Sequence, residues 1–516
     1  MAALAVSLVS HLASAQSAFT IAGYKVLGNS LLSQEKISEA TLPYVGPQSD
    51  FETIQKALES LERAYLAAGY GSIKVELPEQ ELEEGLVTLQ VIEGVLRDIS
   101  IASSGFYDDA NVRNSLPALQ PGLPILLMAL NRNLVLANDT ATKVSNVTFR
   151  RNANNRDVDA VVKVQAEDPQ RWLAVLDNTG SDLNGNYRMG LVYQHANVWN
   201  RDHALVLQLM SSPGYWGQVR IIALGYRVPL YGLGDTLDFN ASDSNVDSRG
   251  TVSGTDIAAV GKGQIAGLRY THNLDPSAEW QHKLSAALET RRYGNSGNTG
   301  DSALSTMPLQ LAYSGSWRTA QRDANWSATW QQNIPAGPQG WEADLQGQGG
   351  RAGARAAFQA WKFSAQLTQR FANQWTVRAG LSGQWTQDLL IAAEQFGIGG
   401  ADSVRGFAER EAAGDQGLRL GLEVGLVPWE SGALRLIPVF FTDAATARRN
   451  APLAGEIASQ TLASAGLGVR AVYGRHASAR LDWGYVVRGL TGTADSAPNG
   501  SVRGDSRFHA SLVWIF

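Results

Sequence analysis

The segment from residue 418 to residue 426 reads Leu418-Arg419-Leu420-Gly421-Leu422-Glu423-Val424-Gly425-Leu426 and alternates strictly between apolar side chains and polar or small ones. Successive side chains of a β-strand point to opposite faces, so this segment predicts a strand with one apolar and one polar face. Comparable runs recur at 236–241, 284–289, 375–385 and 508–516, and clusters of Gly, Asn, Asp and Ser separate them. The chain beyond about residue 170 is therefore predicted to consist of strands joined by turns.

A transmembrane β-barrel explains this pattern better than a soluble β-sandwich does. The alternation extends over residues 170–516, aromatic residues stand at strand ends, and charged residues make up only 18% of the chain. Ordinary soluble domains have ~25% charged residues. In a barrel the apolar side chains face lipid, the polar ones face a wet lumen, and the aromatics lie at the interfaces. The chain ends on Phe516, and a terminal aromatic is typical of the last strand of bacterial outer-membrane barrels.

Composition excludes several other classes of protein. The chain has 516 residues, and 43 Lys and Arg against 48 Asp and Glu give a net charge of −5. The hydrophobic fraction of 44% excludes a disordered chain, and the mean hydropathy of −0.15 excludes a polytopic helical membrane protein. A pI near 5.9 gives no reason to expect nucleic acid as a partner. The absence of Cys excludes disulfides and a thiol nucleophile.

The N-terminal third differs from the rest of the chain. Residues 1–15 are predicted to form a signal peptide, because an apolar run leads to Ala13-Ser14-Ala15, an A-x-A cleavage pattern. All 14 Trp lie at or beyond Trp172. A domain boundary is therefore expected near Pro169.

Residues 19–169 are interpreted as two similar mixed modules, at 19–94 and 95–169. In the first, a helix is expected from Phe51 to Tyr65, because its apolar residues recur at helical spacing. The other predicted elements are strands at 19–26, 72–77 and 85–92, then a strand at 96–102, helices at 108–116 and 126–137, and strands at 143–150 and 157–165. The plan β-α-α-β-β occurs twice, which indicates an internal duplication.

No catalytic constellation is found in the sequence. Lys262 lies between two glycines but lacks the earlier glycine of a phosphate-binding loop, and no zinc-protease or serine-hydrolase motif occurs. The seven His are scattered, and His509 is interpreted as a lumen or surface residue. Glu423 could join an acid–base pair, but a polar lumen wall is the simpler interpretation. We therefore predict no enzymatic activity, no metal site and no cofactor.

Two places in the predicted barrel suggest a specific role. A Gly-rich segment at 396–400 leads to Val404-Arg405-Gly406-Phe407, which could also be a plain surface loop. Asp443 follows Phe441 in a strand whose Leu434 and Leu436 are expected to meet lipid, so Asp443 should point into the lumen. A carboxylate there can be solvated, or it can anchor a cationic loop that folds inward. Arg suits that second role, because its planar fork binds carboxylates bidentately.

Val404-Arg405-Gly406-Phe407 resembles the V-R-G-[YF] motif of the outer-membrane POTRA-barrel superfamily. In that superfamily the motif lies at the tip of an extracellular loop folded back into the barrel, and its Arg contacts an Asp on a neighbouring strand. The resemblance implies Asp443 as this partner. The supporting strand motif F-x-D-x-G occurs here as Phe441-x-Asp443-x-Ala445, so Ala replaces the final Gly.

The two N-terminal modules resemble POTRA domains of the transporter branch of two-partner secretion, the haemolysin and adhesin secretion-activation proteins. The residues that carry this resemblance are Gly28-Asn29, Gly69-Tyr70, Pro78-x-Gln80, Val91-x-Glu93-Gly94 and, at the start of the barrel, Asp177-Asn178-x-Gly180. The resemblance implies POTRA domains at 19–94 and 95–169 and a barrel of sixteen antiparallel strands at 170–516. Many members begin with a pore-plugging helix, and here only a few residues separate the expected cleavage site from Phe19.

The same resemblance implies a function. The protein would lie in the outer-membrane lipid as a monomer, with its POTRA domains in the periplasm, and would export one large unfolded exoprotein that becomes β-helical outside. No ATP and no nucleic acid would be involved. An extended client segment could add as a strand beside the helix at 51–65, and Asn29, Phe51, Tyr65 and Gln80 are the client-binding candidates. An outer-membrane assembly factor, a diffusion porin and a barrel enzyme remain as alternatives.

Overall fold

The computed structural model describes residues 19–81, 85–103, 105–140, 142–151, 157–181, 184–245, 249–251, 258–260, 263–275, 277, 279–297, 300–347, 349–491 and 500–516. The predicted signal peptide lies outside these residues. The chain divides into two compact units. The first comprises Met1–Ser103, Leu116–Leu134 and Ser145–Val164, and the second comprises Ser104–Ser115, Val135–Val144 and Gln165–Phe516.

The first module is a small α+β domain. Its elements are β1(Phe19–Ile21), β2(Gly23–Leu27), α1(Gln34–Thr41), η1(Leu42–Tyr44), β3(Gly46–Ser49), α2(Phe51–Ala67), β4(Ile73–Glu76) and β5(Leu86–Glu93). A sheet has the order β2-β5-β4, in which β2 runs parallel and β4 antiparallel to β5. The predicted helix is α2, and it begins where the Asp50 carboxylate accepts a 2.8 Å hydrogen bond from the Thr53 N–H. Its buried stripe, which includes Leu61 and Tyr65, packs in the domain core.

The second module repeats this plan with β6(Leu96–Ala102), α3(Asp109–Ser115), α4(Leu127–Ala137), β7(Lys143–Arg151) and β8(Val158–Ala166). Its sheet has the order β6-β8-β7, and β6 runs parallel to β8. The predicted plan gave the first module two helices, but only α2 was located in the sequence, and β3 was not predicted. Only three residues of α1 are buried, so its apolar stripe is too short to stand out. No helix in the described part of the chain is long and apolar enough to cross a membrane.

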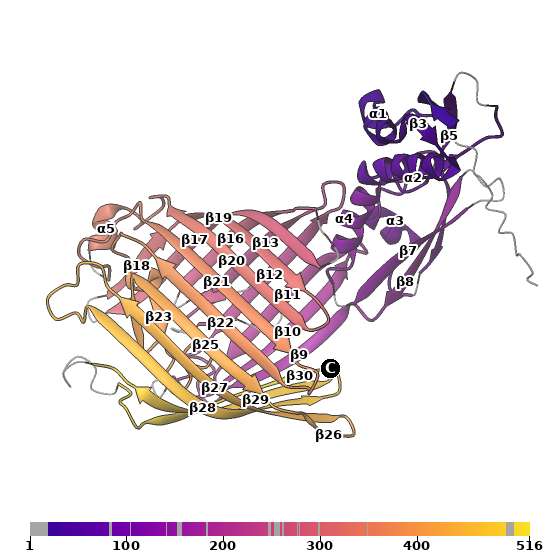
Figure 1. Ribbon diagram of the computed structural model, residues 1–516. Helices are drawn as coiled ribbons and strands as arrows, with labels where there is room; N and C mark the ends of the chain where they lie inside the picture. Colours follow the sequence, from indigo (N-terminus) through magenta and orange to yellow (C-terminus); the bar gives the residue numbers. More distant parts are fainter. Residues whose placement is uncertain are drawn as a thin grey trace, which may run out of the picture. The chain divides into compact units, whose positions relative to one another are not determined.

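The remaining chain forms a closed antiparallel barrel whose strands are strongly tilted (Figure 1). Its walls are β9(Gln170–Asp177), β10(Arg188–Val198), β11(His203–Ser211), β12(Ile221–Leu230), β13(Asp235–Ser244), β16(Gly263–Asn273), β17(Trp280–Gly297), β19(Pro308–Arg318), β20(Arg322–Asn333), β21(Gln359–Arg370), β22(Thr376–Trp385), β25(Gln416–Gly425), β27(Leu434–Arg448), β28(Ser459–Tyr473), β29(Ala477–Arg488) and β30(Ser506–Ile515). β18(Gly300–Thr306) and β26(Trp429–Ser431) extend the hairpins of β17 and β27. The predicted fold class, POTRA domains followed by a sixteen-strand barrel, is confirmed.

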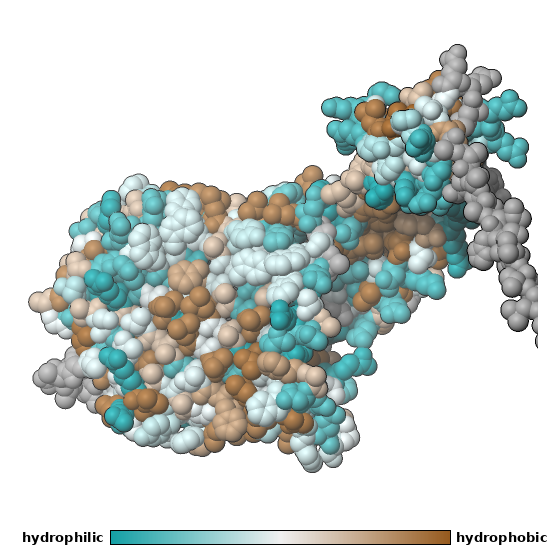
Figure 2. Space-filling view, in the orientation of Figure 1, coloured by the Kyte–Doolittle hydropathy of each residue, from teal (hydrophilic) through white to brown (hydrophobic). Residues whose placement is uncertain are grey.

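Shorter elements lie in the loops of the barrel unit. They are β14(Arg249–Thr251), β15(Ala258–Val260), α5(Glu342–Gln346), η2(Ala392–Glu394), β23(Phe396–Ile398) and β24(Ala412–Gly414). The alternation that predicted the barrel separates its two faces. On β27, Phe440 is 50% exposed on the outside, whereas Phe441 is 5% and Asp443 1% exposed on the lumen side. Figure 2 shows apolar residues spread over the barrel wall and hydrophilic ones gathered mainly near its two ends.

A fully buried lysine lies within the second unit. The Lys143 ammonium donates to Asp202 Oδ2 at 2.7 Å and to Asn111 Oδ1 at 2.8 Å. Asp202, in the turn after β10, also accepts a 2.7 Å hydrogen bond from the Tyr231 hydroxyl. Burial lowers the pKa of Lys143, and the charge of Asp202 offsets this in part. The cluster therefore depends on both charges being present.

We expect Lys143→Met to destabilise the second unit by about 3–5 kcal/mol, because Asp202 is left as a buried charge without its cation. Thermal unfolding followed by Trp fluorescence measures this, since all Trp lie at or beyond Trp172. Arg475→Ala is the control, because its ion pair with Glu167 has side chains 85% and 54% exposed and is worth at most ~1 kcal/mol. Equal midpoints for the two variants would contradict the assignment.

Candidate functional site

The segment between β22 and β25, residues 386–415, folds into the barrel and is here named the inward loop. It carries η2, β23 and β24, and β23 pairs with β24 as a short hairpin. Its side chains bond to residues on the lumen face of β25, β27 and β29. Figure 1 shows β23 near the end of the barrel that carries α5.

Arg405 is the centre of the loop's contacts with the wall. Its Nε donates to Asp443 Oδ2 at 2.7 Å and its Nη2 to Asp443 Oδ1 at 3.0 Å, which is the bidentate geometry expected of Arg with a carboxylate. Its Nη1 donates to Glu423 Oε2 at 2.7 Å and lies 3.6 Å from Asp482 Oδ2. Burial alone lowers the pKa of Arg405, but these carboxylates raise it above its usual value.

Two further arginines balance the three carboxylates. Arg470 lies 2.6 Å from Asp482 and 2.5 Å from Glu423, and Arg480 lies 2.6 Å from Asp482. Arg378 lies 3.8 Å from Glu423, and Asp402 lies 2.9 Å from Arg480. The cluster is thus a network of four acids and four arginines rather than the single pair of Arg405 with Asp443 that the sequence analysis named. Glu423 does face the lumen, as expected, and is part of this network. The sequence analysis did not predict that Asp482 and Arg470 belong to this site. The alternation of side chains along their strands nevertheless places both on the lumen face.

Apolar and aromatic contacts complete the docking of the loop tip. Val404 and Phe407 are fully buried and pack in a cluster with Ala445, the residue that replaces the motif's final Gly. The Arg405 guanidinium carbon lies 3.5 Å from the centre of the Phe441 ring, a cation–π contact. The Gly406 N–H donates to His509 Nε2 at 2.9 Å. His509 therefore lies in the lumen and holds the loop tip.

The loop tip approaches the wall backbone to backbone. Gly406 has φ +95°, and a Cβ on it would lie 3.0 Å from the backbone of Gly484 on β29. A Cβ on Gly484 would lie 2.5 Å from the Gly406 nitrogen and 2.7 Å from the Arg405 carbonyl carbon. Gly406 therefore needs glycine both for its backbone conformation and for the close approach, whereas Gly484 needs it for the close approach alone.

The four client-binding candidates of the first module differ in accessibility. Tyr65 is 0% exposed and its hydroxyl donates to Asn29 Oδ1 at 2.6 Å and to Glu93 Oε1 at 3.1 Å. Asn29 also closes its own turn by bonding the backbone of residue 32. Gln80 bonds both backbone groups of residue 88, at 2.6 Å and 2.8 Å. Gln80 is exposed but its amide is used in these bonds, whereas Phe51 is 59% exposed and offers an apolar side chain to a partner.

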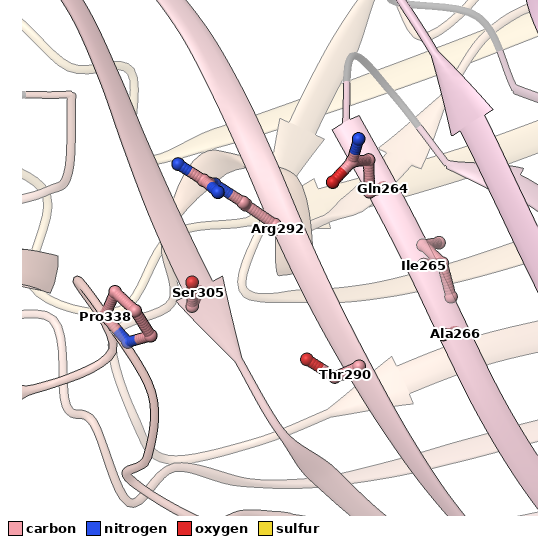
Figure 3. Close-up of a pocket in the computed structure, with 7 residues that line it drawn as sticks. All are labelled: Gln264, Ile265, Ala266, Thr290, Arg292, Ser305 and Pro338. Carbon is pink, nitrogen blue, oxygen red and sulfur yellow. The ribbon is translucent and has the colours of Figure 1, made fainter.

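A pocket of about 250 Å³ lies beside the ends of β16, β17 and β18 (Figure 3). Its lining is Gln264, Ile265, Ala266, Thr290, Arg292, Ser305 and Pro338. Gln264, Arg292 and Ser305 are direct cross-strand neighbours. Arg291 points into the lumen toward Glu394, so the adjacent Arg292 points outward. The polar side of this pocket is therefore on the outer wall and is not part of the inward loop's site.

A closed barrel with an inward loop, preceded by small β-α-α-β-β domains, defines an outer-membrane protein of the POTRA-barrel superfamily. The family model of haemolysin secretion/activation proteins ShlB/FhaC/HecB matches residues 157–471, and the ShlB-type POTRA domain model matches residues 19–94. The chain belongs to this family of two-partner secretion transporters. It lies in the outer membrane, and its POTRA domains lie in the periplasm.

One curated relative and two solved structures show what the chain resembles. The outer membrane transporter CdiB of Dickeya dadantii is 23% identical over 442 residues, which cover 80% of this chain and 73% of that protein. The structure of CdiB from Escherichia coli has a TM-score of 0.77 with 17% identity and covers 99% of this chain and 93% of that one. BamA from Haemophilus ducreyi, in a structure lacking POTRA domains 1–3, has a TM-score of 0.50 with 14% identity, covering 96% and 100%.

The periplasmic location of the POTRA domains fixes the orientation of the barrel. β9 follows these domains, so β9 and every second wall after it run outward. β20 and β22 are the ninth and eleventh of the sixteen barrel strands in chain order. The loop after β20, at 334–358, and the inward loop after β22 are therefore both extracellular loops.

We expect Gly484→Ala to undock the loop tip although it changes no residue of the Val404–Phe407 motif. The added methyl group meets the Gly406 nitrogen at 2.5 Å, closer than packed atoms tolerate. The readout is a single cysteine at Val404, which is fully buried, in a chain that has no other Cys. A water-soluble maleimide should label the cysteine at position 404 slowly in the parent protein and faster in the protein that also carries Gly484→Ala.

Gly380→Ala is the matched control for this substitution. Gly380 lies on the lumen side of β22, two residues from Arg378, which reaches Glu423, and a Cβ on it meets nothing within 4 Å. It should leave the cysteine at position 404 protected. Equal protection in all three chains would show that the loop tip does not depend on the close approach to Gly484.

Proposed function

We propose that this transporter recognises one large exoprotein, which reaches the periplasm unfolded, through its POTRA domains, and exports it through the barrel without ATP. The observation that carries the proposal is the inward loop, which a balanced network around Arg405 holds against the lumen wall. A loop docked by polar contacts inside a lumen suits a pore that must be closed at rest and passable in use. The two POTRA domains supply the place where a client is selected before it enters.

Client recognition is proposed for the first module at the N-terminal end of α2. Phe51 is exposed there, and Leu42 and Val45, which precede α2 closely in sequence, are exposed as well. The edge strand β4 offers main-chain groups to an extended peptide. Glu62 of α2 already accepts a 3.0 Å hydrogen bond from the Val75 N–H on β4. Strand addition at β4 therefore requires Glu62 to release the Val75 N–H, and Phe51 provides a separate apolar contact at the start of α2.

We propose that folding of the client outside the cell makes transport run in one direction. The sequence contains no phosphate-binding loop, so folding of the exoprotein outside, into a β-helix, would prevent its return. The barrel closes on its own strands, with β30 paired to β9. One chain in outer-membrane lipid therefore suffices to form the pore, and we propose a monomer.

An outer-membrane assembly factor of the same superfamily is the second candidate. The likeness to BamA, with a TM-score of 0.50, shows that the barrel fold is shared with such a protein. The likeness to CdiB, with a TM-score of 0.77, extends over 99% of the chain, and the matching family model is that of secretion proteins. These observations favour secretion of one client.

The proposal predicts that deletion of the gene removes one large protein from the culture supernatant and leaves other outer-membrane barrels at their normal level. Comparative proteomics of both fractions measures this. Arg405→Ala should reproduce the loss of secretion while the barrel stays inserted, because Asp443 is left as a buried charge without its cation, at a cost of about 3–5 kcal/mol to docking. A joint decline of many barrels would favour the assembly factor instead.

Two substitutions in the first module separate client contact from structural support. Phe51→Ala should weaken client binding by ~1.5–3 kcal/mol, the value of burying one large apolar side chain, without lowering thermal stability. Tyr65→Phe should lower stability by ~1–3 kcal/mol, because Asn29 and Glu93 lose a buried donor. Pull-down of the client and thermal unfolding measure the two effects. Unchanged binding by Phe51→Ala would exclude this end of α2 as the contact.

A further inference from the structure

The inward loop has a second anchor, centred on Glu394 of η2. The buried Glu394 carboxylate accepts hydrogen bonds from Arg291 Nη1 at 2.9 and 3.0 Å, from the Tyr293 hydroxyl at 2.8 Å and from Thr306 Oγ1 at 3.1 Å. Gln331 Nε2 adds a contact at 3.4 Å. Burial alone would raise the pKa of Glu394, but Arg291 and the other donors hold it well below its ordinary value. The anchor is therefore a charged, fully bonded site.

The two anchors lie on different parts of the barrel wall. Arg291, Thr306 and Gln331 belong to β17, β18 and β20, which lie in one continuous arc of the ring together with β19. The partners of Arg405 and Gly406 belong to β25, β27, β29 and β30. Two further walls, β21 and β22, separate these groups on the shorter path around the ring. The inward loop consequently crosses the extracellular part of the lumen from one side to the other.

Packing and backbone contacts reinforce the Glu394 anchor. Ile391 is buried in a cluster with Tyr293 and Leu304 of the wall and Leu345 of α5. The Gln384 side chain donates to the Glu394 carbonyl at 3.0 Å. The first half of the inward loop is thus fixed to β17–β20 and to the neighbouring extracellular loop at 334–358.

The far end of the inward loop is tied to that same extracellular loop. Arg351 Nη1 donates to both oxygens of Asp415 at 2.8 Å, and both residues are buried. Between Glu394 and Arg405 the chain contains Gly399 at φ +103° and Gly400 at φ +109°, a region that other residues rarely adopt. Glycine at these positions allows the backbone to turn between the two anchors.

We propose that Glu394 is a positioning residue that closes the extracellular mouth of the pore by holding the inward loop to β17–β20, independently of the Arg405 anchor. The proposal rests on the proposed transport function, for which the mouth must be passable. It assigns the two anchors different roles: the Arg405 anchor docks the tip, and the Glu394 anchor keeps the loop stretched across the lumen. Loss of the Glu394 anchor should then open the mouth while the tip stays docked.

The test is a reversible covalent replacement of the anchor. The chain has no Cys, so Thr306→Cys with Glu394→Cys introduces the only two thiols. The native side chains touch at 3.1 Å, which puts both thiols within reach of a short, reducible bis-maleimide. The purified full-length protein is measured by single-channel conductance in planar lipid bilayers. Without the crosslink, the conductance should exceed that of the parent severalfold, and the crosslink should restore the parent value until it is cleaved.

Controls distinguish positioning from folding. Heat-modifiable gel migration reports that the barrel is folded, and a single cysteine at Val404 beside Glu394→Gln should stay protected, because the tip remains docked. Arg318→Gln, which removes an ion pair with Asp323 whose arginine is 71% exposed, should leave the conductance unchanged. A folded uncrosslinked variant with parent conductance, or a crosslink without effect, overturns the proposal.

The conductance requires no client, so this result is separate from the secretion experiment. Normal conductance switching in a protein that secretes nothing would overturn the proposed function and leave the assignment of Glu394 intact. Normal secretion by a protein whose conductance does not respond to the crosslink would overturn the assignment of Glu394 and leave the proposed function intact.

Discussion

The absence of water inside a lipid bilayer is the constraint on which the rest of this structure depends, because every backbone N–H and C=O must find a partner in the protein. An antiparallel sheet meets this demand only when it closes on itself. Here β30 and β9 share five register pairs, whereas β29 and β30 share nine. Asn178 extends the short seam: its Nδ2 donates to the Phe508 carbonyl at 2.9 Å, and its Oδ1 accepts from the Ala510 N–H at 2.8 Å. A side-chain amide thus continues the ladder where the first strand ends.

Closure divides every strand into a lipid face and a lumen face, and the inward loop buries charged residues such as Asp443 between itself and the lumen face. Such charges are stable only when they are balanced and hydrogen-bonded. The clusters around Arg405 and Glu394 both meet this condition with partners from several strands and from one loop. The same chemistry that satisfies the lumen wall therefore fixes the position of the inward loop.

Alternation and helical periodicity sufficed to predict the barrel, α2 and the lumen-facing position of Asp443, because each depends on residues a few positions apart. Contacts between distant segments were not accessible in the same way. Arg291 and Glu394 are 103 positions apart, and no local pattern connects them. Tyr65 illustrates the opposite difficulty: a helical stripe contains both buried and exposed members, and only the structure shows that Tyr65 is inside while Phe51 is at the surface. The network around Arg405 was predicted as one pair because its other members lie on distant strands, and the sequence motif indicates one partner for the arginine.

A loop held by compensated charges as well as by apolar contacts suits the proposed pore, which opens without nucleotide hydrolysis. Undocking apolar surface exposes it to water at about 25 cal/mol per Å², and this cost has no compensation until the loop returns. Undocking an ion pair also breaks hydrogen bonds, but a lumen that fills with water rehydrates both charges, so much of the lost interaction is replaced. The apolar part of the tip is small, chiefly Val404 and Phe407. This balance supports the proposed transport route, in which the entering client, with its own polar backbone, competes for the anchors and displaces the loop.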